Sequence, residues 1–197
     1  MLEETLPPHP RVVFTGRLHP QKNLDVLIEA WPKVASATGA SLVLVGQGPE
    51  KERLEEKARR LGVANRVCFT GAVADVADAL RAADLFVLPS VAEGMSNSLL
   101  EAMATGLPCV ASDIGGNQDL LRPSTGTAVG VLVDGGDPER WADALIGLLN
   151  DPVSRANLGR AARQRIDQEY DLRLVVQRYV TLYRSLLTRE MVSVRFA

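Results

Sequence analysis

Two glutamates, Glu93 and Glu101, stand eight positions apart in a segment typical of a loop that enters a helix. Between them, Gly94 lets the backbone approach a ligand closely, because glycine has no β-carbon. The next three residues would offer free backbone amides at the helix start, where anions bind well; they are Met95, Ser96 and Asn97. A carboxylate in the loop can accept hydrogen bonds from hydroxyl groups, and one within the helix can bind a vicinal diol such as a ribose. The pattern predicts a site for an anionic ligand that carries hydroxyl groups.

Glu101 also has a simpler structural explanation. The segment Ser98-Leu99-Leu100-Glu101 matches a capping box, in which the acid bonds a backbone amide at the helix start instead of a ligand. The sequence leaves both roles of Glu101 open.

Two cations follow the first apolar run of the chain. Arg17 lies in Gly16-Arg17-Leu18, directly after that run, and Lys22 lies near the start of the next helical pattern. A guanidinium can bind a phosphate through two hydrogen bonds, and an ammonium group adds a compact charge beside it. Together they could neutralise a diphosphate without a metal ion. The alternative, that both are ordinary surface cations, stays open.

Other catalytic patterns are missing from the sequence. Gly46-Gln47-Gly48 lacks the third glycine of a dinucleotide-binding fingerprint, which disfavours a redox enzyme of that kind. No Walker-type phosphate loop and no Gly-x-Ser-x-Gly elbow occur. His9 and His19 are the only histidines and have no motif partners, so hydrolase triads and Cys/His metal clusters are unsupported. Gly115-Gly116 ends another apolar run and is weak evidence by itself.

Short β-branched runs alternate with longer amphipathic patterns, which is typical of βαβ units and a parallel sheet. Six strands are expected, at residues 12–15, 41–45, 66–70, 84–88, 108–111 and 130–133. Pro32 is expected to kink the first helix. Ligands of such sheets bind at the carboxyl ends of the strands, where Arg17 and Glu93 lie. The predicted fold class is α/β, an open six-stranded parallel sheet with helices on both faces and extra C-terminal helices.

Helical patterns alone follow the last strand. Asp137 and Asp151 are expected to cap two helices, each with a proline at its first position. The final helix carries an apolar stripe, which should pack against a surface that the other predicted elements do not supply. The stripe consists of Val175, Tyr179, Leu182, Tyr183 and Leu186. Residues 153–189 hold eight arginines against three acids. These arginines form either a solvated helical face or a surface for an acidic partner or anionic lipid headgroups.

Composition indicates a folded protein. The chain has 197 residues, 46% hydrophobic and 23% charged, and a net charge of −2, which argues against nucleic-acid binding. No apolar run approaches the roughly 20 residues that cross a bilayer, and the acidic, proline-rich start is unlike a signal peptide. We therefore expect a cytoplasmic protein, peripheral at the inner face of the membrane if the arginines contact lipid. Cys68 and Cys109 are expected to be buried thiols.

Taken in order, these motifs resemble one family. They are Gly16-Arg17-Leu18 with Lys22-Asn23, Val67 to Gly71 with Asp75, Glu93 to Ala104, and Gly115-Gly116. The chain resembles the C-terminal, donor-binding domain of a group 1 (GT4-like) retaining GT-B glycosyltransferase, from about Val12 to Leu187. Its most specific element is the pair of glutamates separated by seven residues. The resemblance implies a Rossmann-like domain, one half of a GT-B fold.

The resemblance also implies a nucleoside-diphosphate sugar as donor substrate, with no other cofactor and no metal. Arg17 and Lys22 would contact its diphosphate, and Glu93 the sugar hydroxyls, as the catalytic residues. The implied donor-binding residues are Gly16, Val73, Gly94, Met95, Ser96, Asn97 and Glu101. Among these, Glu101 would bind the ribose, and the backbone near Val73 would meet the nucleobase. Cations and helix amides would stabilise the leaving diphosphate, and the anomeric configuration would be retained through front-face attack by the acceptor.

The sequence departs from the family in two respects. Asp119 stands where the family usually has a glutamate, so we discount it as a ligand. The acceptor-binding N-terminal half is missing, so we expect half an enzyme, inactive alone, that transfers a hexosyl group only beside that half. In the family the last helix crosses back onto the other half, which would cover the apolar stripe. The expected organisation is a linker-like segment at 1–10, the donor domain at 11–187 and a tail at 188–197. The alternative is a non-catalytic nucleotide-sugar sensor or regulatory module.

Overall fold

Six strands form one parallel sheet in the order β3-β2-β1-β4-β5-β6. The computed structural model describes residues 6–122, 126 and 128–187. The strands are β1 (Arg11–Thr15), β2 (Ser41–Val45), β3 (Val67–Gly71), β4 (Leu85–Leu88), β5 (Cys109–Ser112) and β6 (Val131–Val133). Each boundary lies within one residue of its prediction. The predicted α/β class and six-stranded parallel sheet are confirmed.

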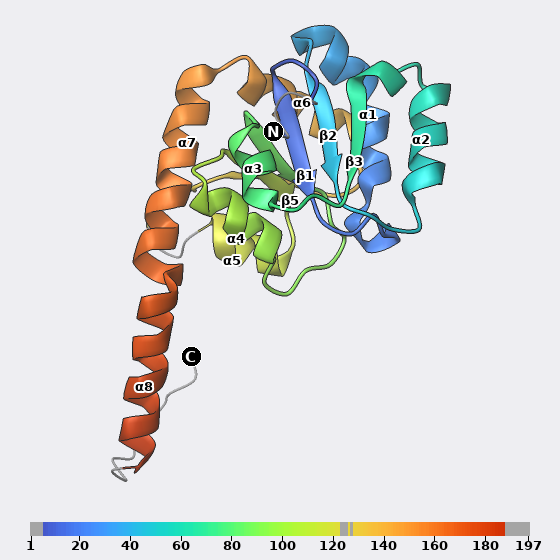
Figure 1. Cartoon of the computed structure of the whole chain (residues 1–197). Helices are drawn as coiled ribbons and strands as arrows, with labels where there is room; N and C mark the ends of the chain where they lie inside the picture. Colours follow the sequence, from blue (N-terminus) through green and yellow to red (C-terminus); the bar gives the residue numbers. More distant parts are fainter. Residues whose placement is uncertain (1–5, 123–125, 127, 188–197) are drawn as a thin grey trace.

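The strand order reverses between β1 and β4. The chain runs outward from β1 through β2 to β3, then returns to place β4 on the other side of β1, where Val13 pairs with Phe86. The central strands β1, β2, β4 and β5 are buried along their whole length, because helices cover both faces of the sheet (Figure 1). In open α/β sheets, the crevice at such a reversal is where ligands bind.

The helices occupy the positions between and after the strands. They are α1 (Leu24–Thr38), α2 (Lys51–Arg60), α3 (Val76–Arg81), α4 (Asn97–Ala104), α5 (Gly115–Leu121), α6 (Pro138–Leu149), α7 (Pro152–Arg165) and α8 (Leu172–Leu187). Helix α1 continues past Pro32 to Thr38, and the kink expected there stays a prediction. The short helix α3, which Asp75 caps by accepting from the Ala77 amide at 2.9 Å, was not predicted.

The two helix N-caps predicted after the last strand are present in the structure. Asp137 accepts a hydrogen bond from the Glu139 amide at 3.0 Å, and Asp151 accepts one from the Ser154 amide at 2.9 Å, so both predicted caps are confirmed. Both cysteines are free thiols. Cys109 is buried, which raises the pKa of its thiol, whereas Cys68 is only half-buried because β3 is an edge strand.

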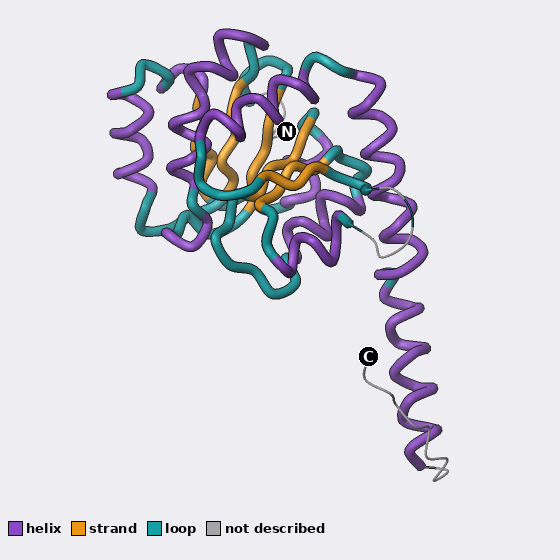
Figure 2. Tube along the Cα trace, turned by 180° about the vertical axis from the view of Figure 1, so that it is seen from behind, coloured by secondary structure: helices purple, strands orange, loops and turns teal. Residues whose placement is uncertain are grey.

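The C-terminal helices form a rod that leaves the globular body. Helix α7, a π-helical segment (Ile166–Tyr170) and α8 follow one another, and α8 extends away from the sheet (Figures 1 and 2). The large apolar side chains exposed on α8 are Leu172, Val176, Tyr179, Val180, Leu182, Tyr183 and Leu186. Four of the five residues of the expected apolar stripe are therefore exposed, whereas Val175, near the start of α8, is half-buried. No helix in the described ranges is long and apolar enough to span a membrane.

The arginines of this rod do not form one uniform solvated face. Arg165 is only 8% exposed, because its guanidinium reaches the body and donates to the Asp119 carbonyl at 2.8 Å. Arg163 is exposed and pairs with Asp167. Arg189 and the predicted tail at 188–197 lie outside the described residues, as do residues 1–5 of the predicted linker.

Candidate functional site

The candidate site lies at the carboxyl ends of β1 and β4, at the lower edge of the sheet in Figure 1. Two loops meet there: the first loop, residues 16–23 after β1, and the second loop, residues 89–96 after β4. The Val91 amide donates to the Gln21 carbonyl at 2.9 Å, and the Gln21 side-chain amide donates to the Ala92 carbonyl at 2.8 Å. Because β1 and β4 are neighbours, these two distant segments become adjacent walls of one site.

Lys22 and Glu93 meet across the two loops. A short 3-10 turn (Pro20–Lys22) carries the lysine, whose ammonium group forms an ion pair with Oε1 of Glu93. The side chains are 19% and 10% exposed, so the pair is sheltered. The ammonium has further donors for an anion, and Oε2 of Glu93 accepts no hydrogen bond from the described residues. The cation and the carboxylate predicted to face one ligand therefore lie on the same side of the sheet.

Arg17 projects from a backbone that is fixed on both sides. The Gly16 amide donates to the Val45 carbonyl at 3.0 Å, and the Leu18 amide donates to the Gln47 carbonyl at 2.9 Å. Leu18 is fully buried, whereas Arg17 is exposed and pairs with no described residue. The backbone of Arg17 is thus held at the end of β1, and its guanidinium has all of its donors available.

The start of α4 has the free amides expected from sequence. Ser96 is the N-cap, and its hydroxyl accepts from the Leu99 amide at 3.4 Å. The amides of Met95, Ser96 and Asn97 donate to no described acceptor. The alternative capping box is wrong, because the helix begins before Ser98 and the exposed Glu101 bonds no described backbone amide.

Glu101 lies apart from the Lys22–Glu93 pair, and no described contact joins it to them. It lines a hollow of about 310 Å³ between α3 and α4, together with Asp75, Val76, Ala77, Leu80, Ala104 and Thr105. Val73 lies two residues before Asp75, half-buried against the core. Of the two residues implied to bind the nucleoside, Glu101 thus lines this hollow, and Val73 precedes by two residues an aspartate that lines it.

Two glycines allow contacts at the loops that sequence patterns did not reveal. A β-carbon on Gly116 would lie 1.6 Å from the carbonyl oxygen of Gly94, and one on Gly48 would lie 2.1 Å from that of Leu18. Gly94 itself has open space where a β-carbon would be. The glycine that permits the tight approach at the second loop is therefore Gly116. The Gly-Gly pair was visible in the sequence, but a local pattern does not say which backbone it meets.

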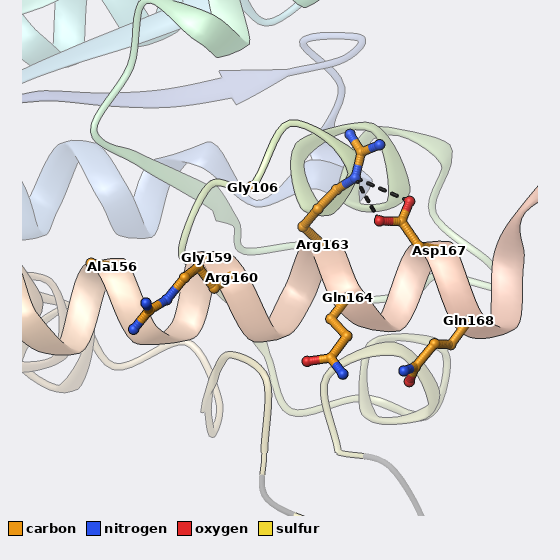
Figure 3. A pocket seen from close by; sticks show the side chains of 8 residues that line it. All are labelled: Gly106, Ala156, Gly159, Arg160, Arg163, Gln164, Asp167 and Gln168. Atoms are coloured by element: carbon orange, nitrogen blue, oxygen red, sulfur yellow. Dashed lines mark hydrogen bonds and ion pairs between the residues drawn. The ribbon is translucent and has the colours of Figure 1, made fainter.

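A second hollow lies away from this site. It has a volume of about 450 Å³ and runs along α7 beside Gly106, where Arg163 pairs with Asp167 (Figure 3). None of the predicted site residues lines it. Within the described ranges, no three His, Cys, Asp or Glu side chains are grouped closely enough to hold a metal ion.

Comparison with known proteins decides the family. The model of the family described as "Glycosyl transferases group 1" matches residues 9–151, which include both loops and helices α1 to α6. The chain belongs to the group 1 glycosyltransferases. The resemblance read from the two glutamates and the loop after β1 is therefore confirmed at the level of the family.

The relatives of this glycosyltransferase chain are about twice its length. A GDP-mannose-dependent monoacylated α-(1-6)-phosphatidylinositol monomannoside mannosyltransferase of Corynebacterium glutamicum is 34% identical over 188 residues, 89% of this chain and 47% of that protein. N-acetyl-α-D-glucosaminyl L-malate synthase of Bacillus anthracis is 32% identical over 84% of this chain and 43% of its own length. The chain thus spans about half the length of the curated relatives it matches.

Solved structures show the same fold. HepE of Anabaena, solved in complex with UDP, superposes with a TM-score of 0.82 at 27% identity, over 89% of this chain and 49% of that one. The C-terminal domain of a group 1 glycosyl transferase from Francisella tularensis, at 24% identity, shares the fold with a TM-score of 0.74 over 87% of this chain and 91% of that one. The chain has the Rossmann-like architecture of GT-B glycosyltransferases.

Proposed function

We propose that this chain is the donor-binding half of a retaining glycosyltransferase, which binds a nucleoside-diphosphate sugar and transfers its hexosyl group to an acceptor held by an N-terminal half. The observation that carries the proposal is the sheltered Lys22–Glu93 pair at the reversal of the strand order. It sets a cation for phosphate beside a carboxylate for hydroxyl groups. A diphosphate joined to a sugar needs these two chemistries side by side.

The diphosphate would bind Arg17 and Lys22. As the sugar bond to the diphosphate breaks, negative charge develops on the leaving oxygen, and cations already fixed in place lower the barrier without reorganising. Arg17 suits this role because its guanidinium is exposed and unpaired among the described residues, while its backbone is fixed. The free amides at the start of α4 would add donors for phosphate or sugar oxygens.

The nucleoside would occupy the hollow between α3 and α4. Glu101 would accept hydrogen bonds from the ribose hydroxyls, and the backbone near Val73 would contact the base. The location of Glu101 in this hollow, and its freedom from the capping box, support that assignment.

The acceptor-binding half would cover α8. Helix α8 exposes several large apolar side chains, with Leu172 74% and Leu186 65% exposed, and contiguous apolar surface of this kind marks interaction sites. Relatives about twice as long as this chain provide a further segment that could pack there. Both observations support an N-terminal half that packs against α8.

Arg17→Ala is expected to weaken the binding of UDP or GDP about ten- to a hundredfold, because charge-assisted hydrogen bonds are worth about 1.5 to 3 kcal/mol. Isothermal titration of the purified chain measures the change. Arg60→Ala is the matched control, since Arg60 is exposed at the far end of α2 and has no described partner. Equal affinities for wild type and Arg17→Ala would remove Arg17 from the site.

Glu93→Ala is expected to lower the affinity for UDP-glucose or GDP-mannose by about tenfold or more, while the affinity for the bare diphosphate changes less than about threefold. The reason is that Glu93 would bind the sugar, and loss of its charge leaves Lys22 free for phosphate. Titration with both ligands gives the ratio, and Glu52→Ala, an exposed change on α2, is the control. Equal losses for both ligands would contradict a role for Glu93 on the sugar.

A further inference from the structure

The second loop is held from the side opposite Lys22 by a buried chain of hydrogen bonds. The Ser112 hydroxyl at the end of β5 donates to the Ser90 carbonyl at 2.5 Å. The Asn117 side-chain amide on α5 donates to the Ser112 carbonyl at 3.0 Å and to the Ser112 hydroxyl at 3.2 Å. These bonds connect α5, through the end of β5, to Ser90, the second residue of the second loop.

Stability alone does not explain these polar groups. Asn117 is fully buried, yet its side-chain carbonyl oxygen has no partner among the described residues. A buried acceptor left unpaired is costly, and an apolar side chain of similar shape would avoid that cost. Among the described residues, the Asn117 side chain makes hydrogen bonds only as a donor, and both bonds go to Ser112. The Asn117 side chain thus links the start of α5 to Ser112 at the end of β5.

The start of α5 touches the second loop directly at the catalytic candidate. A β-carbon on Gly116 would lie 1.6 Å from the carbonyl oxygen of Gly94 and 2.7 Å from that of Glu93. Gly116 precedes Asn117, so the side chain that anchors α5 also fixes this close contact. Ser90 and Gly94 are thus held on either side of Glu93, by β5 and α5 respectively.

We propose that Ser112 and Asn117 are positioning residues for Glu93. Both are buried, and they hold the backbone of the second loop from the β5 side, while Gln21 and Lys22 hold it from the first loop. A carboxylate must stand within a fraction of an ångström of its productive place to select a ligand group. The effect on ligands rests on the proposed function, since it assumes that Glu93 binds the donor sugar.

The first measurement needs no ligand. The Val91 amide is bonded to the Gln21 carbonyl, so its hydrogen exchange reports whether the second loop stays in place. Ser112→Ala removes one oxygen, and it is expected to speed exchange at Val91 about three- to tenfold with the sheet core unchanged. Ser41→Ala is the matched control: Ser41 is equally buried, lies at the amino end of β2, and its hydroxyl has no described partner. Asn117→Leu, which keeps the bulk and removes the donors, should behave like Ser112→Ala.

The second measurement is the ratio of affinities for UDP-glucose and UDP, or for GDP-mannose and GDP. Both variants are expected to lose about three- to tenfold in affinity for the sugar nucleotide and less than about twofold for the bare diphosphate. A merely structural role would weaken both ligands alike or lower only the melting temperature. Unchanged exchange at Val91 in both variants, or equal losses for the two ligands, overturns the proposal. If the wild-type chain binds neither sugar nucleotide, the proposed function fails, and the exchange result still decides whether Ser112 and Asn117 hold the loop.

Discussion

Gly116→Ala is expected to weaken the binding of sugar nucleotides by about tenfold or more and to lower the free energy of unfolding by about 1 to 3 kcal/mol. The new β-carbon would lie 1.6 Å from the carbonyl oxygen of Gly94, which is a backbone atom and cannot rotate away. Either the start of α5 or the second loop must therefore move, and Glu93 moves with the loop. The bare diphosphate should lose less affinity, because Arg17 and Lys22 lie on the other wall.

Gly115→Ala is the control for this change. Gly115 is the neighbouring residue of the same helix, and a β-carbon there meets nothing within 4 Å. It should leave binding unchanged and shift the free energy of unfolding by less than about 0.5 kcal/mol. Urea denaturation and titration with UDP-glucose or GDP-mannose measure both variants. Indistinguishable behaviour of Gly115→Ala and Gly116→Ala would mean that α5 does not touch the second loop.

The central strands could be predicted from sequence because every residue in them is buried. A parallel strand covered by helices on both faces is a short, continuous apolar run, and runs such as Ser41–Val45 can be recognised locally. The order of the strands is a different matter. Local patterns alone do not fix the placement of β4 beside β1, and that placement is what brings Lys22 to Glu93. Residues of the right chemistry were found from sequence, while their meeting depends on the topology.

The helix start at α4 shows how a local pattern misleads. Ser98 with Glu101 fits a capping box better than Ser96 does, yet Ser96 is the cap and Ser98 only approaches its hydroxyl at 3.1 Å. The second loop is fixed from outside, by Gln21 on one side and Gly116 on the other. These distant contacts hold the loop that precedes the helix, and the Ser98–Glu101 spacing carries no information about them.

Gln21, Ser112 and Asn117 were missed for the same reason. Each is an ordinary polar residue in sequence, and its importance lies in a partner that is distant along the chain, such as Ala92 for Gln21 and Ser90 for Ser112. The apolar stripe of α8 could be predicted because amphipathic spacing is local, and the described residues leave it uncovered.

Gly48→Ala is expected to act on the first loop as Gly116→Ala acts on the second, with a different pattern of ligand loss. A β-carbon on Gly48 would lie 2.1 Å from the carbonyl oxygen of Leu18 and 2.7 Å from its nitrogen, so the turn that carries Arg17 must shift. Binding of UDP or GDP should fall about tenfold, and the sugar nucleotides should lose as much, because both share the diphosphate. The free energy of unfolding should fall by about 1 to 3 kcal/mol. Gly147→Ala is the control, since that position in α6 has open space and alanine favours a helix there by up to about 1 kcal/mol. If Gly48→Ala spares the bare diphosphate and weakens only the sugar nucleotides, the first loop does not hold the diphosphate, and the division of the site between the two loops is wrong.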